Sequence, residues 1–193
     1  LGGAIYSYTA NQVRIKGCYI ESCEAVQGSG GAIAFQSLST IYVTDTKIVS
    51  CSAYDGGAIY LGTYITATFT DVAFMNNNAV VNGGAFFIGQ IVRLAMKNIQ
   101  MIGHEALAGG SIYVSDYGVA LTMNNTFIDN TKATGFGGAV AILAPVDRFF
   151  LINTFIRDSI AASDGGTLYF GSGTSLNVNT FPVFGRFQII NMT

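Results

Sequence analysis

The sequence predicts an all-β fold, a right-handed parallel β-helix of about seven coils with about 27 residues in each. Three observations lead to this prediction. A Gly-Gly pair returns at a near-constant interval, the residues between pairs are β-branched and aromatic residues alternating with polar ones, and turn residues return at fixed offsets. Half of the chain is hydrophobic and only 10% is charged, so it can bury a continuous core and is not disordered.

The Gly-Gly pairs mark one end of every coil. Steps of 28, 26, 27, 26, 28 and 28 residues separate their first glycines, and a small residue followed by an apolar one comes after each pair. Because glycine accepts positive φ and allows close backbone approach, each pair is expected to form the sharp turn into the first strand. The pairs are Gly2-Gly3, Gly30-Gly31, Gly56-Gly57, Gly83-Gly84, Gly109-Gly110, Gly137-Gly138 and Gly165-Gly166.

The first strand of each coil follows the glycine pair directly. Its first apolar residue is expected to point inward, so the next residue points outward. Five of the seven outward residues are aromatic, which predicts an exposed stripe suited to a lateral partner or to stacking on sugar rings. The alternative is that loops cover the stripe, or that aromatic stacking only stabilises the sheet. The outward column is Tyr6, Ala34, Tyr60, Phe87, Tyr113, Ala141 and Tyr169.

Two further strands complete each coil. The second strand is expected to send two columns inward, and the third strand one apolar column with a turn residue two places later. Asn98, Asn125 and Asn153 share a column ahead of the third strand, where stacked amides can bond to each other and to the turn backbone. The last repeat carries an insertion around residues 177–182. The expected inward columns are Val13, Ile41, Thr68, Leu94, Leu121 and Phe149, then Ile15, Val43, Thr70, Met96, Met123 and Leu151, then Ile20, Ile48, Met75, Met101, Ile128, Ile156 and Ile189, and the turn column includes Ser50, Asn77 and Asn130.

The Gly-Gly-Ala-Ile motifs alternate with Phe-x-x-Asn motifs at Phe74 to Asn77 and Phe127 to Asn130. This pattern resembles the polymorphic outer-membrane-protein repeat along nearly the whole chain. The resemblance implies a right-handed, pectin-lyase-like β-helix in a secreted or surface-exposed protein, and several proteins with this repeat are adhesins. Similar repeats also occur in large surface proteins of other microbes, including eukaryotic ones. The resemblance carries no catalytic residues, because the motif residues are structural.

Residues 1–193 are expected to be a single array, and because the first repeat begins at once after Leu1 we expect an excerpt of a longer chain. Its open coils would self-associate, end to end or along the rod. The expected location is extracellular or at the cell surface, with glycans or host-cell molecules as partners. A net charge of −2 without a basic block argues against nucleic acid, and no apolar run is long enough to span a membrane.

A polysaccharide lyase or hydrolase is the main alternative, because many long β-helices are such enzymes. Arg14-Ile15-Lys16 matches the Arg-Ile-Lys string of polygalacturonases, but it lacks the paired Asp and the Gly-His-Gly that accompany it in that family. The simpler interpretation is two basic residues flanking an inward Ile. His104 is the only histidine and is expected to be solvated in a turn. The sequence therefore predicts no catalytic residue, no metal site and no cofactor.

Cysteines and glycosylation sequons are the remaining candidate sites. Cys23 and Cys51 share a column one coil apart, which suits either a disulfide or two stacked thiols, while Cys18 is expected to be a buried inward residue. Sequons begin at Asn124 and Asn191. Asn124 is expected to point outward with room for a glycan, and Asn191 falls in the turn column.

Overall fold

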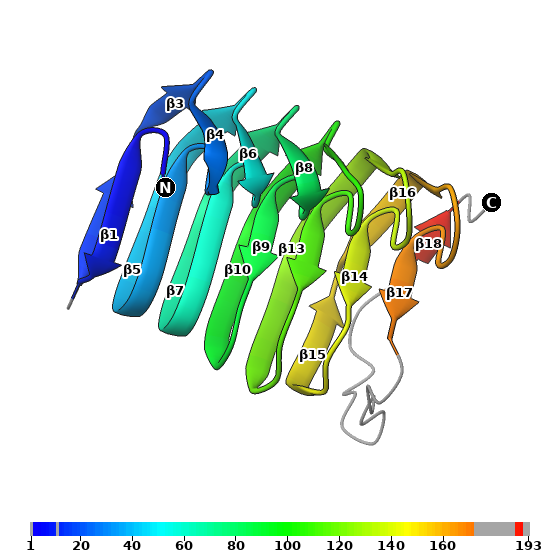
Figure 1. Cartoon of the computed structure of the whole chain (residues 1–193). Coiled ribbons are helices and arrows are strands. Elements are labelled where there is room, and N and C mark those ends of the chain that lie inside the picture. Colours follow the sequence, from blue (N-terminus) through cyan, green and yellow to red (C-terminus); the bar gives the residue numbers. More distant parts are fainter. Residues whose placement is uncertain (1, 11, 172–187, 191–193) are drawn as a thin grey trace.

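The structure is a computed structural model that describes residues 2–10, 12–171 and 188–190. These residues contain strands and no helix, and the strands pair in parallel to form a β-solenoid of about six turns. Figure 1 shows the coils stacked side by side, from β1 at the N-terminal end to β17 and β18 at the other end. The predicted class, an all-β solenoid of parallel strands, is confirmed.

The strands follow the coils in order. The first coil contains β1 (Ile5–Thr9), β2 (Val13–Lys16), β3 (Tyr19–Glu21) and β4 (Glu24–Ser29). The next two coils each contain one long bent strand and one short strand, namely β5 (Ile33–Val49), β6 (Ser52–Asp55), β7 (Ile59–Met75) and β8 (Asn78–Asn82). The remaining strands are β9 (Phe86–Ile88), β10 (Val92–Ile102), β11 (Glu105–Ala106), β12 (Ile112–Val114), β13 (Val119–Ala133), β14 (Val140–Ile142), β15 (Val146–Ile152), β16 (Phe155–Ala161), β17 (Leu168–Phe170) and β18 (Gln188–Ile190).

The core is a continuous stack of inward side chains along the solenoid axis. Its widest aromatic group consists of Phe69, Phe74 and Phe86, all at most 1% exposed. Their ring centroids lie 4.7 to 5.9 Å apart in edge-on or tilted pairs. Such contacts add packing enthalpy to the hydrophobic term, so the middle coils are tightly held.

The third coil departs from the expected register by one residue. Ile41 pairs with Ala67, and Val43 with Phe69, so Thr68 and Thr70 point outward. The interval from Ile41 to Ala67 is 26 residues, one fewer than the expected pairing with Thr68 required. A shift of one residue in a strand moves every side chain to the opposite face.

The same shift runs on into the third strand. Phe74 pairs with Ile48 and Met101 in the core, where the sequence analysis wrongly expected Met75. The turn position, with φ of 52°, belongs to Asn76, and Asn77 is buried instead. Phe127 is outward, unlike Phe74, so the two Phe-x-x-Asn motifs are not structurally equivalent.

The glycine pairs lie where the chain turns into the first strand of each coil. The first glycine of every pair has φ between 62° and 73°. The second glycine is a point of close approach: a Cβ added to Gly57 would overlap the carbonyl oxygens of Gly84 and Asn78. Successive turns are joined by backbone hydrogen bonds, such as the Gly57 N–H donating to the Gly83 carbonyl at 3.1 Å. Any other residue at the second position would push the coils apart.

A second corner carries the predicted stack of polar side chains. Asn125 Nδ2 donates to Asn98 Oδ1, and Asn98 Nδ2 donates to Asp71 Oδ1, each at 2.8 Å. All three residues have φ between 52° and 55°, a conformation that Asn and Asp tolerate better than most residues. The predicted bonding between stacked amides is confirmed for Asn98 and Asn125, and Asn153 has the same left-handed backbone, with φ of 47°.

Candidate functional surfaces

The seven residues of the predicted outward aromatic column do lie in one continuous column. Ladder pairing joins Tyr6, Ala34, Tyr60, Phe87, Tyr113, Ala141 and Tyr169 in succession. The column is less exposed than the sequence predicted: Tyr6 is 41% exposed, the four other aromatic residues are half-buried, and the two alanines are buried. At the far end, the ring of Phe136 lies 4.5 Å from that of Tyr169.

The aromatic rings in the middle of this column stack on one another. The centroids of Tyr60 and Phe87 are 5.0 Å apart at an interplanar angle of 13°, and those of Phe87 and Tyr113 are 5.7 Å apart at 25°. Because the ring faces are covered by the neighbouring rings, the column presents edges and hydroxyl groups to solvent. This geometry favours sheet stabilisation over stacking on a sugar ring.

An acidic group flanks the hydroxyl side of this column. Burial raises the pKa of Tyr60 and of Tyr113, and the nearby Asp55 carboxylate raises both further. Burial also raises the pKa of Asp55, and hydrogen bonds from Asn82 oppose that rise. Asn82 Nδ2 donates to Asp55 Oδ1 at 2.8 Å. The phenols therefore stay protonated and can act as hydrogen-bond donors.

A buried polar column runs through another corner of the solenoid, and of its members only Cys23 and Cys51 were expected to share a column. Its N-terminal member Cys23 is half-buried, and the members above are buried. Adjacent register pairs place one member in each successive coil. Each member comes three residues after an inward apolar residue, and that spacing is the signal that could have revealed the column. The buried polar column is Cys23, Cys51, Asn77, His104, Thr131 and Ser159.

Side chains of this column satisfy backbone groups of the coil before. Asn77 Oδ1 accepts the Cys51 N–H at 2.9 Å, and Asn77 Nδ2 donates to the Ile48 carbonyl at 3.0 Å. In the next coil His104 Nδ1 accepts the Asn77 N–H at 3.1 Å. Buried N–H groups cost free energy when unpaired, so these side chains complete the backbone at a corner.

His104 is buried, which corrects the expectation that it is solvated in a turn. It is 1% exposed, and burial lowers its pKa to about 4. His104 Nδ1 lies 3.1 Å from the Asn77 N and 3.3 Å from the Asn77 carbonyl oxygen, and within the described residues Nε2 has no hydrogen-bond partner. A ring that cannot reach solvent and stays neutral cannot take a proton from an external substrate.

All three cysteines are free thiols in the structure. Burial, together with the neighbouring Cys23 thiol, raises the pKa of Cys51 to about 11, so Cys51 is an unreactive thiol at neutral pH. Cys18 lies on an inward column, as expected, but it is exposed. The physical reason is its place in the first described coil, which packs against a described coil on one side only.

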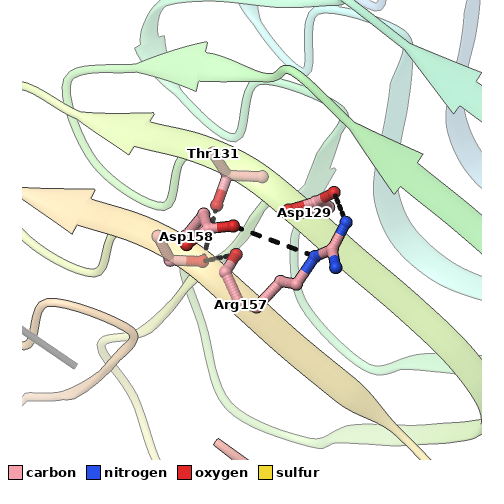
Figure 2. A network of polar contacts seen from close by, with 5 residues as sticks. Asp129, Thr131, Arg157 and Asp158 are labelled. Carbon is pink, nitrogen blue, oxygen red and sulfur yellow. Dashed lines mark hydrogen bonds and ion pairs between the residues drawn. The ribbon is translucent and has the colours of Figure 1, made fainter. Parts of the chain in front are cut away.

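A network of charges links the fifth and sixth coils on the outside of the third strand (Figure 2). Arg157 Nη2 lies 2.8 Å from Asp129 Oδ2, and Arg157 Nε lies 3.8 Å from Asp158 Oδ2. Beneath them Thr131 Oγ1 donates to Ser159 Oγ at 3.0 Å. A carboxylate pair that shares one guanidinium joins coils electrostatically, with a strength limited by its exposure to solvent.

The remaining sequence candidates occupy simple positions. Arg14 and Lys16 are exposed on either side of the buried Ile15, as the simpler interpretation expected. Asn124 is a half-buried residue of the outward column that also contains Thr70 and Lys97. Asn191 lies outside the described residues.

Three kinds of comparison add no further identification. No protein-family model, no curated protein and no solved structure matches the chain. Within residues 2–10, 12–171 and 188–190, no three His, Cys, Asp or Glu side chains gather into a group that could hold a metal ion. The same part of the chain has no helix with the length and hydropathy required to cross a bilayer. The candidate function therefore rests on the solenoid and its surfaces.

Proposed function

We propose that this chain is a rigid rod segment of an extracellular structural or adhesive protein, built from repeats of the polymorphic outer-membrane-protein type. The observation that carries the proposal is the parallel ladder, which joins each described coil to the next from the first coil to the sixth. A solenoid of this kind gains length by adding coils without altering its cross-section. It therefore suits a protein that must span distance and present a repeated surface.

The organisation of the polar groups supports a structural role. The buried polar column and the Asp71–Asn98–Asn125 stack both satisfy the solenoid's own corners. The aromatic rings of Tyr60, Phe87 and Tyr113 stack on each other. Each of these contacts holds one coil to the next, so together they would resist a pulling force along the rod axis.

The enzyme alternative loses its histidine candidate. His104 is buried and neutral, and Arg14 and Lys16 flank a core residue. A carbohydrate-binding module that uses the aromatic column would have to recognise ring edges, with Tyr6 as the one well-exposed ring. The rod proposal requires neither a catalytic group nor an open aromatic face.

Electron microscopy of the natively purified protein tests the proposal. We expect continuous rods or filaments with an axial repeat of about 4.8 Å, and sugar density at Asn124 if the protein passes through a eukaryotic secretory route. Discrete, compact monomers with an open substrate groove would overturn the rod and favour an enzyme.

A further inference from the structure

One face of the solenoid collects the positive charge of an otherwise acidic chain. The outward side chains of β2, β10 and β15 include Arg14, Lys16, Arg93, Lys97 and Arg148, and all five are exposed. They are five of the nine Lys and Arg residues in a chain of net charge −2. We call these five residues the basic face.

The basic face runs along the solenoid axis. Arg93 pairs with Ala120, which pairs with Arg148, so the two arginines share one column two coils apart, or about 10 Å along the axis. Lys16 and Lys97 share the outward column four residues further along the strand, through Thr44 and Thr70, and Arg14 lies in the column between. The charges therefore occupy three outward columns and extend from the first coil to the sixth, about 24 Å along the axis.

A hollow of about 330 Å³ lies between the two arginines. Ala95 and Ala120 line it, where larger side chains would fill the space, and so do threonines such as Thr122. Guanidinium groups bind carboxylate or sulfate oxygens through paired N–H donors, and hydroxyls suit the neutral groups of a sugar. The hollow thus combines the two kinds of contact that an acidic sugar needs.

The basic side chains are free to meet an external anion. The ion pairs within the described residues involve Lys132 and Arg157, and none involves the basic face. Arg148 Cζ lies 5.3 Å from the ring centroid of Phe150, a contact that leaves the guanidinium edge available. Asp147 also lines the hollow, so the hollow itself holds two arginines and one acid.

We propose that the basic face binds an extended acidic polysaccharide, with a carboxylate or sulfate group seated between Arg93 and Arg148. This inference rests on the proposed adhesive function and names its ligand class. Duplex nucleic acid fits less well, because over about 24 Å it carries roughly 14 charges at one per 1.7 Å, against five bases. A polysaccharide with one charge per one or two sugars has a charge spacing closer to that of the five widely separated bases.

Binding of the full chain to heparin and to polygalacturonate, with neutral dextran for comparison, tests the inference. We expect affinity for at least one acidic polymer that weakens as salt rises, and none for dextran. In the double variant Arg93→Ala and Arg148→Ala the dissociation constant should rise at least about tenfold. Heparin and polygalacturonate separate a preference for sulfate from one for carboxylate.

A matched control removes two positive charges elsewhere. Lys47→Ala with Lys132→Ala alters exposed residues outside the basic face and should leave binding within about twofold of the unmodified chain, since screened distant charges act weakly. Arg93→Lys with Arg148→Lys keeps the charge but loses the paired donors, so its affinity should be intermediate. Circular dichroism checks that each variant is folded.

Three outcomes would overturn the inference: equal loss in the two alanine double variants, absence of binding to both acidic polymers, or preferential binding to duplex DNA. Rods without polysaccharide binding would leave the proposed function and remove only this inference. Polysaccharide binding by compact monomers would leave this inference and remove the proposed rod function.

Discussion

At the residue scale, His104 makes the stability of the fold depend on pH. Its native pKa of about 4 lies below the value of 6.5 for the unfolded chain. Between these values the unfolded chain binds a proton that the native ring does not, so the stabilising effect is complete above pH 6.5 and is lost as pH falls toward 4. The shift corresponds to roughly 3 kcal/mol in the free energy of unfolding.

Urea denaturation at several pH values measures this dependence in two variants. His104→Asn keeps an acceptor for the Asn77 N–H, as Asn77 does for Cys51 in the coil before, and should flatten the change between pH 6.5 and 4. His104→Leu removes the acceptor and should lower stability at pH 7.5 by about 1–3 kcal/mol. If the stability of His104→Asn depends on pH as that of the unmodified chain does, groups other than His104 produce the dependence.

At the element scale, the glycine turn limits which residues each coil accepts. Gly57→Ala should lower the free energy of unfolding by about 3 kcal/mol or more, or prevent folding, because its Cβ would overlap backbone of the next coil. Gly17→Ala is the matched control, since Gly17 also sits in a turn, with φ of 64°, but has no atoms within 4 Å of an added Cβ. Gly17→Ala should lower the free energy of unfolding by only about 1 kcal/mol, because alanine is strained in left-handed backbone. Similar urea midpoints for the two variants would contradict this account.

The polar stack at the second corner can be separated from its backbone conformation. Asn98→Gly keeps the left-handed backbone, with φ of 55°, and removes the hydrogen bonds to Asp71 and Asn125. We expect it to cost about 1 kcal/mol, and Asn98→Ala to cost roughly 1 kcal/mol more because of backbone strain. Thermal unfolding of the two variants measures the difference, and a more stable Asn98→Ala would refute the strain argument.

The elements differ in how far their sequence reveals them. The glycine pairs and the first strands are predictable because the turn chemistry and the Ile column lie next to each other in every repeat. The second and third strands of the third coil are misassigned by one residue, because Thr68 and Thr70 resemble strand residues and Ala67 is a weak apolar signal. Only tertiary pairing with Ile41 and Val43 determines that register.

The surfaces are less predictable than the coils. The outward aromatic column was found from spacing, but its half-burial depends on ring stacking between coils. The basic face is not apparent from the sequence, because Arg93 and Arg148 are 55 residues apart. Only ladder pairing through Ala120 places them in one outward column. The spacing of three residues after the inward Met101 could have placed His104 in the buried column, but its bond to the Asn77 N–H depends on the pairing of two coils.

At the scale of the whole molecule, stability is expected to vary along the axis. Ile5, Val13 and Ile20 in the first coil are only partly buried, while Ile33, Ile41 and Ile48, their ladder partners in the second coil, are at most 1% exposed. In a solenoid each coil is stabilised mainly by its neighbours. Amide hydrogens of β1 to β3 should therefore exchange at least about tenfold faster than those of β7 and β10.

Hydrogen exchange measured over a range of protein concentrations also separates the two modes of self-association. End-to-end stacking would supply ladder partners to β1, β2 and β3, so their exchange should slow as concentration rises while that of β7 stays constant. Lateral association would leave these backbone groups open and protect outward side chains instead. Exchange in the first coil that is as slow as in β7 at the lowest concentration would contradict the nearest-neighbour account, since a coil paired on one side would then be as stable as one paired on both.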